Sequence, residues 1–436
     1  DVNDKLKINS SLKYTISGAD NRPSTTDRGA NPLQALYDIN SHIDILDMKN
    51  YWLVEGVSQN APYNFGDNPY FLANEINNGF KRKRLMGNIQ ANYTFTDKLS
   101  LMARFAYNDS HEVRETKISS GFNDEPDGAY GLSNINGVET NVDFLLTYQD
   151  KLNQDFDYSL SVVGNSRNLN NNSSSAQTKN GGSGLVVPNL FTLSNIASDN
   201  ISYGSSTSKK RVNSLYALGN ISFKNTVFVD ASVRNDWSST LPKDNNSFLY
   251  PSVSSSILLD KIFDMGNDVS LFKLRVGWAQ AGNDTSAYNL YSVLSNSGDW
   301  GAASQLSVSA ALKNDEIKPE INTSTEYGVD LSLFRNKITM DFTYYESDNK
   351  NQIFQKSLPI SSGATSKLFN AGNLNSKGFE ASLGSVLVKN DDLRWNMNLT
   401  FTTNKTIITE LAPGTDYVSF CFYARNGAYT WVGEEI

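Results

Sequence analysis

The sequence contains few of the residues on which enzymes and metal sites depend. Its 436 residues include one cysteine, Cys421, and two histidines, His42 and His111. A single cysteine cannot form a disulfide within the chain or a cysteine-based zinc site. The two histidines are far apart and lie in segments that read as loops or strand ends, so solvated histidines are favoured over a metal ligand or a catalytic base. We therefore predict no enzyme activity, no metal site and no cofactor.

Two short segments could hold a ligand, but a simpler interpretation is favoured for each. The glycine-rich segment Gly181–Gly184 follows no apolar strand and lacks the Lys-Ser/Thr end of a phosphate-binding loop. The acidic segment Asn123–Gly128 offers oxygen ligands for Ca²⁺, but it has neither the spacing of an EF-hand nor its closing glutamate. We interpret both segments as solvated loops or turns.

Long apolar runs and positive charge are also scarce. No segment approaches the roughly 18 consecutive apolar residues of a transmembrane helix, although the strands of a membrane barrel are only half apolar and give a weaker signal. The net charge of −8 and the pI near 5.0 disfavour binding to nucleic acid. The chain starts at Asp1 without a signal peptide and stops at Ile436 without a terminating feature, so we expect an internal segment of a longer protein.

The sequence is rich in alternating apolar and polar side chains. Between Thr226 and Trp237, one face carries valine and alanine, and the other carries polar and charged side chains. A strand with two such different faces separates an apolar medium from a polar one. The pattern recurs in about thirteen segments, most of them paired across short turns. These segments are Lys5–Ser17, Arg84–Phe95, Lys98–Asn108, Val138–Gln149, Phe156–Arg167, Arg211–Phe223, Thr226–Trp237, Phe248–Asp260, Val269–Ala281, Ile321–Phe334, Lys337–Asp348, Ser376–Lys389 and Leu393–Lys405.

The connections between these segments alternate between short and long. The long connections are Gly18–Lys83, Asp109–Gly137, Asn168–Lys210, Gly282–Glu320 and Asn349–Asn375, with an intermediate one at Ser238–Ser247. Outer-membrane barrels combine short periplasmic turns with long extracellular loops in the same way. We therefore predict an all-β chain that forms part of an antiparallel transmembrane β-barrel. Because about thirteen strands do not make an even-numbered closed barrel, we expect strands to be missing at both ends.

Two further features complete this prediction. Within the first long connection, Pro32–Leu46 could be helical. Aromatic residues on the apolar faces lie near the strand ends, as the interface belts of membrane proteins do. Those beside short turns are Phe95, Tyr148, Phe156, Phe223 and Trp395, and those near long loops are Tyr107 and Trp237.

The polar faces supply the candidate binding residues. Asp230, Arg234, Asp236 and Arg275 are charged residues on those faces. An arginine or lysine that faced lipid near the midplane would cost about 2–4 kcal/mol, so these residues are predicted to line the lumen. They could contact a substrate, or they could form a charge network on the wall or against a plug. The wall or plug interpretation is favoured.

The basic run Lys81–Arg84 also has two interpretations. It could contact anionic outer-membrane lipid or lipopolysaccharide phosphates at the outer end of a strand. It could instead be a solvated cluster that keeps the strand end out of the bilayer. The solvated cluster is favoured.

Several motifs, taken in their order and spacing, resemble the SusC/RagA family of TonB-linked outer-membrane transporters of Bacteroidota. The motifs are Asn68-Pro69-Tyr70, Leu185–Asn195 (LVVPNLFTLSN), Arg234–Pro242 (RNDWSSTLP) with Tyr250-Pro251-Ser252, Lys273–Asp284 (KLRVGWAQAGND), Ile317-Lys318-Pro319-Glu320, the strand pair in Glu326–Tyr345 and Asn370–Glu380 (NAGNLNSKGFE). The resemblance covers most of the chain.

The resemblance implies a barrel of about 22 strands with a plug in its lumen, the large plugged-transporter type. Residues 1–436 would then be a segment of a single TonB-dependent-receptor barrel domain, without the N-terminal plug and the C-terminal strands. It also implies active import of an oligosaccharide or a peptide, TonB as a partner through the missing N-terminal part, and a SusD-like surface lipoprotein as a lid.

Two other functional classes remain open from the residues alone. One is an outer-membrane or surface β-rich binding protein, such as a lectin-like protein or an adhesin, which would bind without transporting. The other is an outer-membrane enzyme such as a barrel lipase or protease. The enzyme would need histidine with serine or an acid converging on the wall, and the sequence offers no such group.

Overall fold

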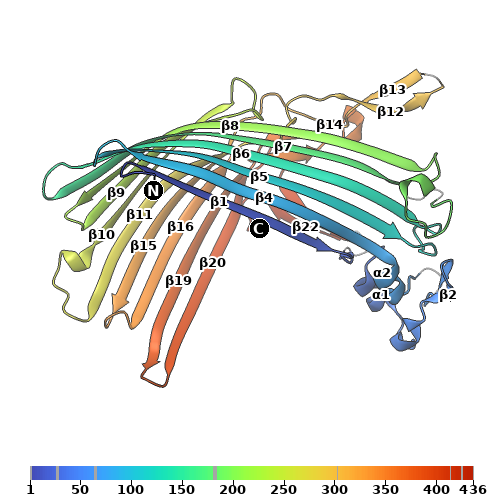
Figure 1. Ribbon diagram of the computed structural model, residues 1–436, viewed down its shortest axis with the longest axis horizontal. Coiled ribbons are helices and arrows are strands. Elements are labelled where there is room, and N and C mark those ends of the chain that lie inside the picture. Colours follow the sequence, from blue (N-terminus) through green and yellow to red (C-terminus); the bar gives the residue numbers. More distant parts are fainter. Residues whose placement is uncertain are drawn as a thin grey trace.

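A single large antiparallel sheet dominates the fold. The computed structural model describes residues 2–25, 29–62, 66–179, 184–301, 303–412, 414–423 and 426–435. The sheet contains thirteen strands, and every hydrogen-bonded neighbour is the next of these strands along the chain (Figure 1). The strands are β1 (Leu6–Ala19), β4 (Ile76–Thr94), β5 (Leu99–Ile118), β6 (Ala129–Lys151), β7 (Phe156–Thr178), β8 (Ile201–Phe223), β9 (Val227–Ser238), β10 (Ser247–Leu258), β11 (Val269–Asn283), β15 (Glu320–Leu333), β16 (Ile338–Lys350), β19 (Asn373–Lys389) and β20 (Arg394–Glu410).

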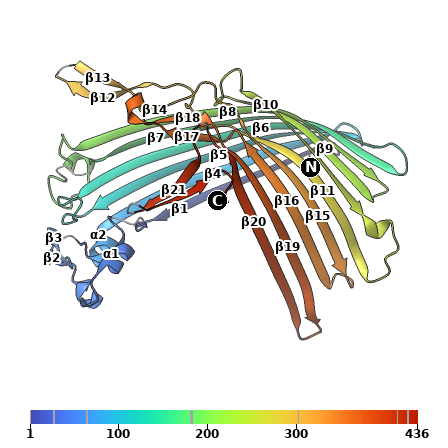
Figure 2. The ribbon, with the colours of Figure 1, turned by 180° about the vertical axis from the view of Figure 1, so that it is seen from behind.

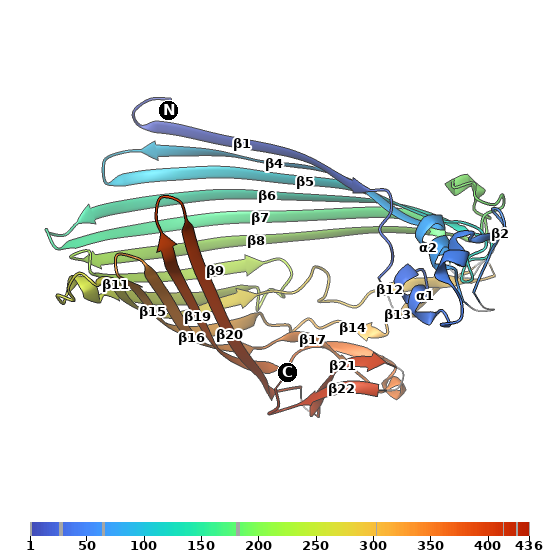
Figure 3. The same cartoon turned by 90° about the horizontal axis from the view of Figure 1, so that it is seen from below.

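This sheet confirms the thirteen predicted strands and the predicted fold class. It curves around a central space, and β1 and β20 form its two edges (Figure 3). The chain therefore forms part of an antiparallel transmembrane β-barrel. Its short turns gather at one end and its long connections at the other, as the alternation of connection lengths predicted.

The strands from β4 to β8 are longer than predicted. They contain 19 to 23 residues, whereas β9 and β10 contain 12 residues each. The predicted loops Asp109–Gly137 and Asn168–Lys210 are therefore wrong in extent, since only residues 119–128 and 179–200 connect the strands. Beyond the membrane both faces are polar, so the alternation disappears from the sequence while the pairing continues from Asn168↔Arg211 to Thr178↔Ile201.

The first long connection contains two short helices and a small hairpin. The predicted helix in Pro32–Leu46 is only partly helical, because α1 covers Pro32–Asp38 and a 3₁₀ turn covers Ile45–Lys49. Helix α2 (Pro69–Glu75) was not predicted. Strands β2 (Trp52–Val54) and β3 (Ser58–Gln59) form the hairpin. Among the described residues, no helix has the length and apolar character needed to cross a membrane.

The outer face of the sheet is a continuous apolar band. The register places Ile89 opposite Phe105 and Phe105 opposite Val142, so that apolar side chains continue from strand to strand. Ile89 is 58% exposed and Leu160 is 57% exposed, although both are paired with neighbouring strands within the sheet. Large exposed apolar side chains of this kind fit a lipid-facing surface. Trp237 lies on the same face near the long-loop end and is 40% exposed, as the predicted interface belt requires.

The buried apolar clusters lie at the long-loop end. One joins α2 to the β5–β6 connection, a second packs Tyr130 against residues 185–201, and a third joins the connections that follow β9, β11 and β16. Small strands extend from this end (Figure 2). They are β12 (Leu294–Trp300), β13 (Ala303–Val308), β14 (Ala311–Leu312), β17 (Ile353–Ser357), β18 (Ser366–Asn370), β21 (Tyr417–Tyr423) and β22 (Asn426–Trp431).

Candidate lumen-wall site

Arg234 and Asp236 form a closed cluster on the inner face of β9. Arg234 Nε donates to Asp236 Oδ1 at 2.8 Å, and Arg234 Nη2 donates to Ser214 Oγ at 3.0 Å. The guanidinium lies 5.1 Å from the centre of the Tyr216 ring and 5.8 Å from that of Tyr250, distances at which a cation and a ring face attract. The Tyr250 hydroxyl donates to the second oxygen of Asp236. Both charged groups are thus already hydrogen-bonded to other residues of the wall.

Arg275 is the centre of a second cluster on β11. Its Nη2 donates to Asp341 Oδ2 at 2.6 Å and lies 2.9 Å from Asp330 Oδ1. The side chain crosses Gly328, where an added Cβ would lie 2.7 Å from the guanidinium carbon. Glycine at 328 therefore provides the space that lets the arginine reach both carboxylates, and these two carboxylates on β15 and β16 neutralise Arg275.

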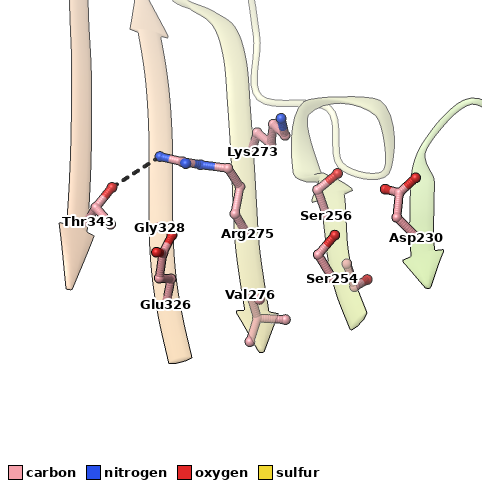
Figure 4. A pocket seen from close by; sticks show the side chains of 11 residues that line it. Asp230, Ser254, Ser256, Lys273, Arg275, Val276, Glu326, Gly328 and Thr343 are labelled. Atoms are coloured by element: carbon pink, nitrogen blue, oxygen red, sulfur yellow. Dashed lines mark hydrogen bonds between the residues drawn. The ribbon is translucent and has the colours of Figure 1, made fainter. Parts of the chain in front are cut away.

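Asp230 lies beside a hollow in the inner wall (Figure 4). The hollow has a volume of about 270 Å³, and small residues form much of its floor. Asp230 accepts a hydrogen bond from Asn220 Nδ2 at 2.7 Å and is exposed. Glu326 is also exposed at the opposite side of the hollow. The lining includes Ser254, Ser256, Lys273, Gly277 and Thr343.

The four predicted lumen residues therefore differ in what remains available to a ligand. Arg234, Asp236 and Arg275 are held by wall partners, whereas the Asp230 carboxylate has no cationic partner among the described residues. The arrangement offers hydrogen-bond acceptors and hydroxyl groups to a polar ligand, a plug or water. Among the described residues, no group of three or more histidine, cysteine, aspartate or glutamate side chains could hold a metal ion.

The remaining sequence candidates lie away from this wall. His42 is exposed in a turn, and His111 lies on β5 rather than at a strand end, where its Nδ1 is hydrogen-bonded to Asn136 Oδ1. Asn123–Gly128 forms part of the β5–β6 connection, and Asn123 donates its backbone N–H to Asp67. Gly184 is described, but residues 181–183 of the glycine-rich segment lie outside the described residues.

The basic run Lys81–Arg84 is divided by the period of β4. Arg82 points inward, where its Nε donates to Glu112 Oε2 at 2.5 Å. Arg84 also points inward, and its Nε donates to Asn108 Oδ1 at 2.8 Å. Lys81 and Lys83 lie on the opposite face. Only half of the run therefore faces the side on which lipid would lie.

Sequence reasoning missed that several motifs join the long connections to one another. Asn189 is the clearest case, with a positive φ of 60°. Its Oδ1 accepts from the Ser120 N–H at 2.9 Å, and its Nδ2 donates to Gly56 O at 3.0 Å. One side chain therefore connects residues 51–59, 119–128 and 184–200.

Asp284 also connects separate segments at the long-loop end. Its carboxylate accepts hydrogen bonds from Ser238 and from Thr240, the latter at 3.1 Å, and it pairs with Lys210. The two motifs RNDWSSTLP and KLRVGWAQAGND thus meet at one buried carboxylate. This contact fixes the start of the connection that follows β11.

The other motifs at the long-loop end also form joints. Ile317 is fully buried, and Glu320 accepts from the Ile353 N–H at 2.7 Å. Asn370 accepts from the Lys318 N–H at 2.7 Å and donates to Lys318 O at the same distance. Asn68 caps α2 and donates to Met48 O at 3.0 Å. The signal in the sequence was the position of two of them, since Ile317–Glu320 and Asn370–Glu380 lie where a long connection meets a strand, whereas Asn68 lies within the first long connection.

Asp67, in the first long connection, leads to a prediction about pH. Burial raises the pKa of the Asp67 carboxyl, although hydrogen bonds from Gln59 and Asn123 oppose that shift. The folded connection therefore favours the protonated acid, so its stability is greatest below the ordinary aspartate pKa of about 3.9 and falls as the pH rises through the raised value. Asp67→Asn should remove this dependence. Hydrogen exchange at the Asn123 N–H, corrected for its intrinsic rate, measures it, and an unchanged pH profile in the variant would contradict the assignment.

The fold and the two faces of the sheet define a class, the outer-membrane type of β-barrel. A family model described as "TonB dependent receptor-like, beta-barrel" matches residues 8–431. The chain belongs to this family, and its predicted SusC/RagA-like character is confirmed. The family consists of receptors and transporters.

Relatives in sequence and structure agree with this assignment. TonB-dependent receptor P3 of Formosa agariphila is 25% identical over 368 residues, which cover 80% of this chain and 35% of that protein. TonB-dependent receptor P39 of the same organism is 23% identical over 241 residues, 55% of this chain and 23% of that protein. The RagAB peptide transporter has a TM-score of 0.80 at 18% identity, over 99% of this chain and 48% of that chain. The ferric citrate transporter FecA has a TM-score of 0.52 at 12% identity, over 94% and 50%. The chain thus spans at most about half of these relatives.

Proposed function

We propose that the intact protein imports a nutrient across the bacterial outer membrane in a TonB-dependent manner. Residues 1–436 would be a segment of its single barrel domain, and TonB would act through the N-terminal part of that protein. The main support is the pairing of a lipid-type outer face with a charged inner face in a chain of the TonB-dependent receptor family. Such a wall separates lipid from a polar passage.

The substrate we propose is an oligosaccharide or a peptide. Serine and threonine hydroxyls, the Asp230 carboxylate and the exposed Glu326 line the inner-wall hollow. Hydroxyl and carboxylate groups bind the hydroxyls of sugars, and they bind the amides and amines of peptides equally well. The RagAB relative is described as a peptide transporter, which supports the second class.

We also propose a SusD-like surface lipoprotein as a lid on the long-loop end. The joined connections carry exposed apolar side chains at their tips. Leu53 is 73% exposed, Val57 is 59% exposed and Val186 is 68% exposed. The hydrogen bond from Asn189 to Gly56 holds the segments that carry them together. Exposed apolar side chains gathered on a rigid platform fit a protein partner better than water.

Uptake by whole cells tests the import function. Cells that carry the intact gene should accumulate labelled oligosaccharide or peptide, and deletion of either this gene or TonB should abolish that accumulation. Accumulation that persists without TonB would contradict TonB-dependent import, and binding at the cell surface without any accumulation would favour a surface binding protein. Purification from native membranes in mild detergent tests the lid separately, because recovery of the barrel alone would exclude it.

A further inference from the structure

The middle of β8 carries three consecutive cations, Lys209, Lys210 and Arg211, that the strand divides between its two faces. Lys210 points inward and pairs with the buried carboxylate of Asp284. Lys209 and Arg211 lie on the opposite face and are both exposed. Lys210 therefore forms an ion pair within the wall, whereas the charges of Lys209 and Arg211 remain on the lipid side.

Arg211 and Lys209 lie at the level expected for lipid headgroups. Arg211 is twelve residues from Phe223, the aromatic residue at the short-turn end of the same face. At about 3.3 Å per residue and a tilt of about 40°, this separation corresponds to a height of about 30 Å. The apolar band of an outer-membrane barrel is about 25 Å tall. Arg211 therefore lies just above the acyl chains, and Lys209 lies one step higher.

The outward side chains around Arg211 change from apolar below it to polar at its own level. Below it on β8, Leu215 is 49% exposed, and Trp237 on β9 is 40% exposed. At its own level, Arg211 Nε donates to Asn168 Oδ1 at 2.5 Å, which holds the guanidinium against β7. Opposite Lys209, the buried Asn170 Oδ1 has no hydrogen-bond partner among the described residues. Apolar side chains thus lie below a level at which amides and cations lie side by side, as acyl chains lie below the phosphorylated sugars of a glycolipid.

Acidic side chains are absent from this part of the outer face. Strand β8 has no aspartate or glutamate, and Asp157, Asp230 and Asp236, the acids of β7 and β9, lie on the inner face. Two other outward cations are neutralised. Lys377 pairs with Glu346 at 2.9 Å, and Lys405 pairs with Glu435 at 3.5 Å. The charges of Lys209 and Arg211 have no such partner among the described residues.

We propose that this outer surface of β8, formed by Lys209 and Arg211 with Asn168 and Asn170, binds the phosphorylated headgroup of an outer-leaflet glycolipid. Arginine and lysine supply the charge that a phosphate requires, and the arginine fork can bind two of its oxygens. The Asn168 oxygen orients the guanidinium, and the Nδ2 groups of Asn168 and Asn170 donate to sugar oxygens. The acyl chains lie on Leu215 and Trp237. The site is distinct from the lumen wall and from the run Lys81–Arg84, whose arginines face inward.

The test uses the intact protein in lipid nanodiscs with bisphosphorylated lipid A as the probe. Native mass spectrometry counts the lipid A molecules that remain bound. The double variant Lys209→Gln/Arg211→Gln should reduce binding about tenfold or more, since each cation near a charged lipid surface contributes substantially. The charge-preserving variant Lys209→Arg/Arg211→Lys should retain most of the binding, which excludes misfolding as the cause.

A matched control removes two cations from the other end of the barrel. Lys151→Gln/Lys224→Gln changes the net charge equally but alters the short turns, so lipid A binding should not change. An equal loss in this control would overturn the proposal, and so would equal binding of dephosphorylated lipid A by the unaltered protein. Displacement of lipid A by inorganic phosphate at similar concentration would indicate a free-anion site and would also overturn it.

Discussion

Replacing Ala231 with arginine should destabilise the folded barrel by about 2–4 kcal/mol, because the new charge would face the middle of the bilayer. The register places Ala231 between Gly219 and Val253 on the apolar outer face. Replacing the next residue, Ser232, with arginine should cost much less. Ser232 lies on the inner face, where its Oγ is 2.6 Å from Ser252 Oγ and where other arginines are already paired.

Unfolding of the two variants by urea in lipid vesicles measures this difference. Both carry the same new side chain one position apart, so any general effect of arginine cancels between them. Equal destabilisation would contradict the assignment of faces, and a larger loss for Ser232→Arg would reverse it.

The second large effect is expected at Ile317, which is fully buried in the cluster that joins three connections. Truncating a buried isoleucine to alanine typically costs about 2–5 kcal/mol. Ile317→Ala should therefore loosen the connections after β9, β11 and β16 together, since Leu241, Phe248 and Leu368 all pack in the same cluster. Protease cleavage within 284–319 and 351–372 should become about tenfold faster or more.

Ile360 offers a matched control in the same group of connections. It is 82% exposed, so Ile360→Ala removes the same atoms without opening a cavity and should leave cleavage unchanged. The separate cluster around Phe71 and Leu72 should also stay intact in Ile317→Ala. If Ile317→Ala loosened both clusters, or neither, the view that these two clusters at the long-loop end are independent cores would be contradicted.

The thirteen strands could be predicted because the membrane imposes two different media on every strand. The alternation of Val227–Val233 with Asp230–Asp236 follows directly from that constraint. The constraint ends at the headgroups, and beyond them the polar residues of Asn168–Thr178 alternate in no visible way. Backbone pairing with β8 continues there, so the strand persists where its sequence signal has stopped.

The contacts that join the long connections to one another could not be predicted, and the reason is different. Asn189 is connected to Gly56 and to Ser120, and Asp284 to Lys210 and Ser238, across large distances in the sequence. A single sequence carries no record of which distant residues meet. The motifs could be recognised as unusual, yet their role as links became visible only in three dimensions.

The candidate site on the lumen wall was predicted in its location and only partly in its chemistry. The period of two places Asp230, Arg234 and Asp236 on the inner face, as the structure has them. Which of these charges are already neutralised depends on partners from neighbouring strands, such as Ser214 and Tyr250 for the Arg234–Asp236 pair. A substrate role for these residues and for Arg275 stays a prediction.

A bromine-quenching scan of β9 tests the central claim, that this sheet separates lipid from a polar lumen. In a Cys421→Ser background, single cysteines at positions 229 to 234 of the intact protein are labelled with a small fluorophore in vesicles of brominated lipid. We predict strong quenching at 229, 231 and 233 and weak quenching at 230, 232 and 234. Uniform quenching along the strand, or the opposite alternation, would contradict the account.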